Sequence, residues 1–99
     1  ARLATMKPTA YLVNTSRGGI VDEAALAAAL RAGKLAGAAL DVRVNEPPGA
    51  DDPIAGAPNL LLTPHVAGIT DEAQDRISIA VAEDVLRVLR GERPLFAVK

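Results

Sequence analysis

The sequence lacks cysteine and has almost no aromatic side chains. Among its 99 residues there is no cysteine and no tryptophan, and there is one tyrosine and one phenylalanine. The absence of cysteine excludes disulfides, thiolate zinc sites and cysteine nucleophiles. Few aromatic residues and a formal net charge of −1 leave neither a stacking platform nor a basic surface for nucleic acid. We therefore expect no nucleic-acid partner, and no metal site is predicted.

Longer patterns are missing as well. No apolar run is long enough to span a bilayer and no secretory signal is recognisable, so we expect a cytoplasmic protein without a membrane partner. No G-x-G-x-x-G or P-loop pattern occurs, so a dinucleotide pyrophosphate would have to bind elsewhere. The chain opens with Ala1, and its first residues resemble the end of a helix. We expect a fragment of a longer protein.

Short apolar runs alternate with a helical segment, which predicts an α/β fold. Residues 9–14 form a short, nearly continuous apolar run, typical of a parallel strand covered on both faces, and similar runs follow at 35–42 and within LLLTPH at 60–65. Asp22 and Gly33 delimit an alanine-rich helix between the first two runs, which makes a βαβ unit. The composition of residues 45–59 favours a surface loop, and a second helix is expected at 70–90.

One ionisable residue follows each predicted strand. Arg17 comes after the first strand, Asp41 closes the second and His65 follows the third, while Glu46 lies on the loop beyond Asp41. Because ligands of open parallel sheets bind beyond the carboxyl ends of the strands, we expect these four groups at one site. Each taken alone has a simpler interpretation: a solvated loop arginine or glutamate, a backbone cap, or a structural histidine.

The shared edge favours a chemical role for the set. An arginine fork binds a carboxylate bidentately and can polarise an adjacent carbonyl. A histidine can give a proton to an oxygen and take it back, and a carboxylate such as Glu46 can support it. Arg17, Glu46 and His65 therefore suit the interconversion of an alcohol and a carbonyl beside a carboxylate.

Three segments carry a family resemblance. MKPTAYLVNTSRGGIVDEAALAAALRAGKLAGAALDV, NEPP and LLTPHVAGIT together resemble the C-terminal part of the NAD-binding domain of D-isomer-specific 2-hydroxyacid dehydrogenases, such as phosphoglycerate, glyoxylate/hydroxypyruvate and D-lactate dehydrogenases. The resemblance implies the second mononucleotide-binding half of a Rossmann-type, doubly wound parallel sheet with three αβα layers. Residues 1–91 would form this half, and residues 92–99 a tail returning toward a substrate domain.

The resemblance also implies an oxidoreductase that transfers a hydride between NAD(H) and a small D-2-hydroxy or 2-oxo acid; NADP stays open. Arg17 would bind the substrate, His65 would be the acid/base and Glu46 would support it. The implied cofactor-binding residues are Thr15, Ser16, Arg17, Asp41, His65, Val66, Ala67 and Gly68. We expect a homodimer in the intact protein and no activity from the isolated chain.

Two departures from the family accompany this resemblance, and other functions compete with it. The larger departure is that the glycine-rich fingerprint, the acidic residue that selects NAD over NADP and the substrate-domain loops are absent from these 99 residues. The family usually has an aromatic residue and often an acid after A-L-D-V, where this chain has Arg43 and Val44. Formate dehydrogenases of the superfamily carry an amide in place of Glu46, which argues against that activity. A dinucleotide-sensing interaction module, as in related corepressors, keeps the same Arg, Glu and His, and an inactive half-domain is a further alternative.

Overall fold

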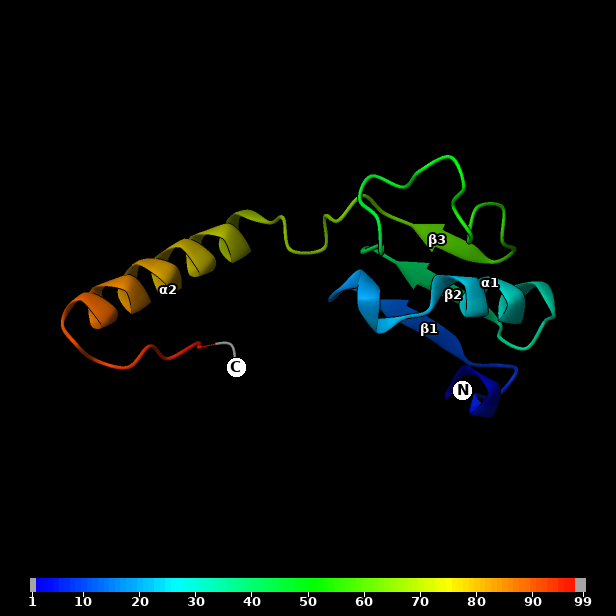
Figure 1. Ribbon diagram of the computed structural model, residues 1–99, viewed down its shortest axis with the longest axis horizontal. Helices are drawn as coiled ribbons and strands as arrows, with labels where there is room; N and C mark the ends of the chain where they lie inside the picture. Colours follow the sequence, from blue (N-terminus) through cyan, green and yellow to red (C-terminus); the bar gives the residue numbers. More distant parts are fainter. Residues whose placement is uncertain (1, 98–99) are drawn as a thin grey trace. The chain divides into compact units, whose positions relative to one another are not determined.

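The computed structural model describes residues 2–97, which form two units (Figure 1). The first unit extends to Val66 and the second begins at Ala67. In chain order, the first unit contains η1 (Arg2–Thr5), β1 (Tyr11–Asn14), η2 (Gly18–Ile20), α1 (Glu23–Arg31), β2 (Gly37–Leu40) and β3 (Leu60–Leu62). The second contains α2 (Asp71–Leu89). The predicted boundary between residues 91 and 92 stays a prediction.

The three strands form one parallel sheet in the order β1-β2-β3, which confirms the predicted fold class. At its carboxyl edge, Asn14 lies beside Leu40 and Leu40 beside Leu62. The three strands therefore end level with one another. Residues that follow them must emerge at the same edge, which is where open α/β sheets bind ligands.

Helix α1 begins and ends where the sequence predicts. The Asp22 carboxylate caps its first turn by accepting a hydrogen bond of 2.9 Å from the Ala25 N–H. Gly33 takes a φ of +63° just beyond the last turn, a conformation that costs glycine little. Leu26 and Leu30 are buried between the helix and the sheet, where they join Leu40 in the core.

Within the first unit, the face of the sheet that α1 does not cover is exposed. Successive strand side chains alternate between the two faces. Tyr11, Val13 and Leu61 are more than 60% exposed, whereas Leu40 is almost fully buried. The expectation that residues 9–14 are covered on both faces is therefore not met within this unit, because α1 packs on one face.

The loop between β2 and β3 differs in part from the predicted surface loop. Most of residues 45–59 is exposed, but Ile54 is completely buried and belongs to the core cluster. Next to it, the Ala55 carbonyl accepts a hydrogen bond of 3.1 Å from the Arg31 guanidinium at the end of α1. The loop is thus attached to the sheet and helix at its middle, which fixes its course past the carboxyl edge.

The second unit is a long helix with a returning tail. Thr70 caps α2 by accepting from the Ala73 N–H at 3.1 Å, and Gly91 has a φ of +78° just after the helix. Asp84 accepts hydrogen bonds from the backbone N–H groups of Leu95 and Phe96, at 2.7 and 3.0 Å. Among the described residues, no helix has both the length and the hydrophobicity needed to cross a membrane.

Candidate functional site

A buried asparagine organises the turn after β1. The Asn14 side chain donates to the Arg17 carbonyl at 2.9 Å and accepts from the Ser16 N–H and hydroxyl, at 3.1 and 3.2 Å. This arrangement folds the chain back on itself within three residues, as asparagine commonly does at turns. Thr15, Ser16 and Arg17 are consequently exposed at the carboxyl edge.

The Arg17 guanidinium lies at the surface. Its Nη1 donates a hydrogen bond of 2.7 Å to the Ser16 carbonyl, a contact within its own turn. No hydrogen bond or ion pair links it to Glu46 or His65 among the described residues. The structure therefore places Arg17 at the expected edge without joining it to the other predicted site residues.

Asp41 ties the ends of two strands together. Its Oδ1 accepts a hydrogen bond of 2.5 Å from the Thr63 hydroxyl and one of 2.9 Å from the Val66 N–H. Only 5% of Asp41 is exposed. A buried carboxylate with such donors holds the segment after β3 close to the end of β2, and so fixes where His65 emerges.

Glu46 and His65 form a hydrogen-bonded pair at this edge. Their Oε2 and Nδ1 atoms are 2.7 Å apart, and the other carboxylate oxygen of Glu46 accepts from the Arg43 N–H at 2.7 Å. That backbone N–H is the main reason why the pKa of Glu46 lies below its usual value, and the bond to His65 acts in the same direction. Glu46 is thereby kept as a carboxylate facing the imidazole.

His65 has an unusual backbone conformation. Its φ of +56° lies in the left-handed region, which residues other than glycine seldom adopt. Such conformations persist only where the surroundings impose them, and they are found most often at functional sites. Half of the His65 side chain is exposed, and Nδ1 is the ring nitrogen that Glu46 contacts.

The pair borders a cavity of about 440 Å³. It is lined by Asp41, Arg43, Glu46, Pro47, Pro48, Leu62, Thr63, Pro64 and His65. The walls are largely apolar, and the polar groups converge at one end of strands β2 and β3. This combination is usual for a small-molecule site, because apolar walls hold the ligand while a few polar groups orient it.

Two further predicted residues, Ala67 and Gly68, belong to the second unit. There the Gly68 carbonyl accepts from the Gln74 side chain at 3.2 Å. No group of three or more metal-binding side chains occurs in the part of the chain that the structure describes. Asp41, Glu46 and His65 are thus the predicted residues that the structure brings together at one cavity.

Sequence reasoning missed the residues that support this site. Asn14 holds the turn after β1, and Thr63 holds the Asp41 carboxylate. Arg43 pairs with Glu23 and Asp52. Asn14 and Thr63 both lie in the quoted motifs, at strand ends, and that position was an available signal. The pairing of Arg43 could not be read from sequence, because its partners are 20 and 9 residues away.

Residues 1–67 match the model described as "D-isomer specific 2-hydroxyacid dehydrogenase, NAD binding domain". The (S)-sulfolactate dehydrogenase of Chromohalobacter salexigens is 54% identical over 87 residues, which are 88% of this chain and 28% of that protein. The glyoxylate reductase of Thermofilum pendens is 47% identical over 93 residues, 94% of this chain and 27% of that protein. The chain thus spans little more than a quarter of these relatives.

Solved structures give a consistent result. A D-isomer specific 2-hydroxyacid dehydrogenase from Xanthobacter autotrophicus Py2, in complex with NADPH and MES, superposes with a TM-score of 0.80 at 40% identity. The match covers 99% of this chain and 40% of that one. A D-lactate dehydrogenase with NAD+ from Lactobacillus jensenii gives a TM-score of 0.73 at 32% identity, over 99% of this chain and 33% of that one.

Proposed function

Since the chain belongs to the D-isomer specific 2-hydroxyacid dehydrogenase family, whose NAD-binding domain its residues 1–67 match, we propose that it carries the acid/base half of such a dehydrogenase. The reaction would be hydride transfer between NAD(H) and C2 of a small D-2-hydroxy acid or 2-oxo acid. The observation that carries the proposal is the Glu46–His65 pair, 2.7 Å apart beside a cavity at the carboxyl edge of the sheet. A cytoplasmic homodimer stays a prediction.

The residues at the edge fit the nicotinamide end of the cofactor. A nicotinamide ring has flat apolar faces and a carboxamide that donates hydrogen bonds, and the cavity offers apolar walls with the carboxylate of Asp41 among them. Asp41, Thr63 and His65 would hold this end, with Thr15 and Ser16 at the neighbouring turn. When bound, the nicotinamide supplies the hydride acceptor or donor, and the protein supplies orientation and protons.

His65 would move the proton. Its Nδ1 is held by Glu46, which leaves Nε2 to give a proton to the carbonyl oxygen of a 2-oxo acid, or to take one from the hydroxyl in the reverse direction. Fixing one ring nitrogen with a carboxylate sets the orientation of the ring. General acid/base help of this kind typically contributes about 10² to 10⁴ in rate.

Arg17 would bind the substrate carboxylate. Its guanidinium stays charged near neutral pH and matches a carboxylate with two parallel donors. The proposal rests on its place directly after β1, at the edge that also carries Asp41 and His65. Its contact in the structure, with the Ser16 carbonyl, is a single hydrogen bond at the surface that a substrate could displace.

The test uses the full-length protein and the absorbance of NADH. Wild-type protein should reduce at least one acid among glyoxylate, hydroxypyruvate, pyruvate, phosphohydroxypyruvate and sulfopyruvate. Arg17→Ala should lower turnover about 10²-fold or more while NADH still binds. The control is Arg31→Ala, because Arg31 contacts the Ala55 carbonyl and lies outside the cavity lining. NADH binding without turnover of any acid would contradict the proposal and favour a dinucleotide-sensing module.

A further inference from the structure

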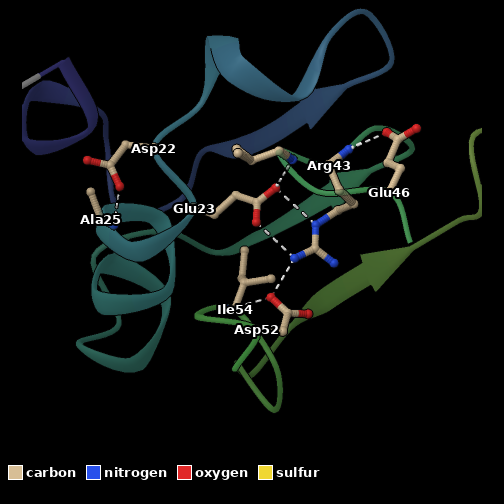
Figure 2. A network of polar contacts seen from close by, with 8 residues as sticks. Asp22, Glu23, Ala25, Arg43, Glu46, Asp52 and Ile54 are labelled. Atoms are coloured by element: carbon tan, nitrogen blue, oxygen red, sulfur yellow. Dashed lines mark hydrogen bonds and ion pairs between the residues drawn. The ribbon is translucent and has the colours of Figure 1, made fainter. Parts of the chain in front are cut away.

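Arg43 is a buried arginine whose side chain is held by two carboxylates (Figure 2). Its Nε and Nη2 donate to the two oxygens of Glu23, at 3.0 and 2.9 Å, and Nη2 also donates to Asp52 at 2.6 Å. The exposed fraction of the Arg43 side chain is 7% and that of Glu23 is 6%. A bidentate pair of this kind fixes a guanidinium in both position and orientation.

The backbone of Arg43 contacts the site directly. Its N–H donates to the Glu46 carboxylate at 2.7 Å, and the next N–H, that of Val44, donates to Glu23 at 2.8 Å. The Arg43 carbonyl lies so close to Gly18 that a Cβ on that glycine would be 1.9 Å from it. Side chain and main chain of one residue thus connect α1, the turn that carries Arg17, and the Glu46 loop.

Given the proposed function, on which this step rests, we propose that Arg43 is a positioning residue for the Glu46–His65 pair. Its side chain anchors the loop to Glu23 and Asp52, and its N–H then holds the Glu46 carboxylate where the other oxygen meets Nδ1 of His65. This N–H and the His65 imidazole each contact one oxygen of the Glu46 carboxylate. A loop free to shift would carry the acid/base group out of line with its substrate, and small misplacements of reacting groups are costly in rate.

Arg43 also lines the cavity, so direct contact with the substrate is the main competing role. Two carboxylates already offset its charge, and it is largely shielded from solvent. A guanidinium neutralised in this way attracts a further anion weakly. The two roles separate in kinetics, because a substrate ligand would change the KM of the 2-oxo acid whereas a positioning residue changes kcat.

The first experiment measures kcat and KM in the full-length protein for Arg43→Met, Arg43→Lys and the control Arg31→Met. Arg31 also anchors the β2–β3 loop, at Ala55, but away from Glu46. Arg43→Met should lower kcat about 10- to 100-fold with the KM of the 2-oxo acid within about twofold. Arg43→Lys should recover part of this loss, because an ammonium keeps the charge but not the fork. Arg31→Met should stay near wild type.

A double-variant cycle with Glu46→Gln separates positioning from a general effect on the fold. If Arg43 acts through Glu46, adding Arg43→Met to Glu46→Gln should lower kcat less than about twofold further. If the fold-losses in kcat of the two single variants multiply in the double variant, the proposal is overturned. A kcat within about twofold of wild type for folded Arg43→Met would also overturn it. If Arg43→Met does not fold, Arg43→Lys decides: a wild-type kcat overturns the proposal, and a reduced kcat at constant KM supports it.

The second experiment does not depend on turnover. In protein labelled with ¹⁵N-histidine, the ring signals of His65 are assigned by their loss in His65→Gln. Arg43→Met should move the Nδ1 signal toward its position in Glu46→Gln, and Arg31→Met should leave it in place. An unmoved signal in folded Arg43→Met overturns the positioning role. Wild-type protein without turnover would instead contradict the proposed function, and the Nδ1 signal would still decide the role of Arg43.

Discussion

Two charged clusters each include residues of the loop between β2 and β3, and they differ in how deeply they are buried. The first, Glu23 with Arg43 and Asp52, has side chains that are at most 11% exposed. The second, Glu46 with His65, has side chains that are 37% and 50% exposed. The Arg43 N–H joins them, because it donates to Glu46. One cluster is closed to solvent and the other faces it.

The difference shows how charge serves two purposes in one small unit. In the buried cluster each carboxylate receives hydrogen bonds from Arg43, and these bonds lower the pKa of Glu23 and of Asp52 and raise that of Arg43. Such a group stays charged and holds its neighbours. In the exposed pair Glu46 contacts one imidazole nitrogen, and under the proposed function the other nitrogen exchanges a proton with the substrate. Stability should therefore depend on the first cluster, and catalysis on the second.

Removal of Glu23 should have the largest effect on stability. Glu23→Ala leaves Arg43 with Asp52 alone and leaves the Val44 N–H without its acceptor. Loss of one partner from a buried pair typically costs about 3 kcal/mol in the free energy of unfolding. Urea denaturation followed by circular dichroism measures this value in the full-length protein. A loss below about 1 kcal/mol would mean that the cluster does not hold the unit together.

Acid should weaken the same cluster, with a smaller effect because the carboxyl groups stay in place. Hydrogen bonds from Arg43 lower the pKa of Glu23 from 4.5 and that of Asp52 from 3.8. The folded state therefore binds these protons less readily than the unfolded state does. The stability that they contribute is complete above their ordinary pKa values, and it is lost as pH falls through the lowered ones.

Unfolding by urea at a series of acid pH values tests this dependence. Wild-type protein should lose stability below about pH 4, and Glu23→Gln should show a shallower decline because one of the two carboxylates no longer titrates. Lys34→Gln is a suitable control, since it changes charge outside the cluster. Parallel curves for wild type and Glu23→Gln would contradict a contribution from Glu23.

Asp52→Asn should cost less than Glu23→Ala. The amide keeps the size of the side chain and can still accept one hydrogen bond, so Arg43 loses charge pairing on one side only. We expect a loss of about 1 kcal/mol in the free energy of unfolding. Asp51→Asn is a matched control, because Asp51 is the adjacent acidic residue in the chain and is exposed. Equal losses in the free energy of unfolding from both variants would mean that the change in loop charge, and not the pairing with Arg43, is responsible.

The smallest effect on stability is expected for the exposed pair. Glu46→Gln replaces a carboxylate that is more than one-third exposed, and ion pairs of that kind contribute little. The urea midpoint of its unfolding should stay close to that of wild type while turnover falls. A stability loss as large as that of Glu23→Ala would remove the distinction between the two clusters.

The sequence was sufficient to predict the strands and helices of the molecule. Short apolar runs predicted the three parallel strands, and Asp22 and Gly33 marked the ends of α1, because these signals are local. The sequence also predicted that Asp41 and His65 lie at one edge of the sheet, since residues that follow parallel strands share that edge. The same reasoning placed Glu46, on the loop beyond Asp41, near this edge, and in the structure its carboxylate lies 2.7 Å from the His65 ring.

Features that depend on contacts distant in sequence were not predictable. Ile54 looks like part of a polar loop, yet it fills the core because the loop folds back over α1. Arg43 was recognised only as a departure from the family, and its partners emerged from the packing of α1 and the loop around it. The left-handed backbone of His65 has no sequence signal, because histidine adopts it only where surrounding contacts impose it.

The most direct test of the central claim is a single-turnover measurement on His65→Gln. Full-length protein loaded with NADH is mixed with the 2-oxo acid that the wild type reduces best, and the loss of NADH absorbance gives the rate of hydride transfer. Glutamine keeps a polar side chain but cannot act as the acid, so the rate should fall about 10² to 10⁴-fold with NADH affinity unchanged. A rate within about threefold of wild type would show that the Glu46–His65 pair is not the acid/base of this site.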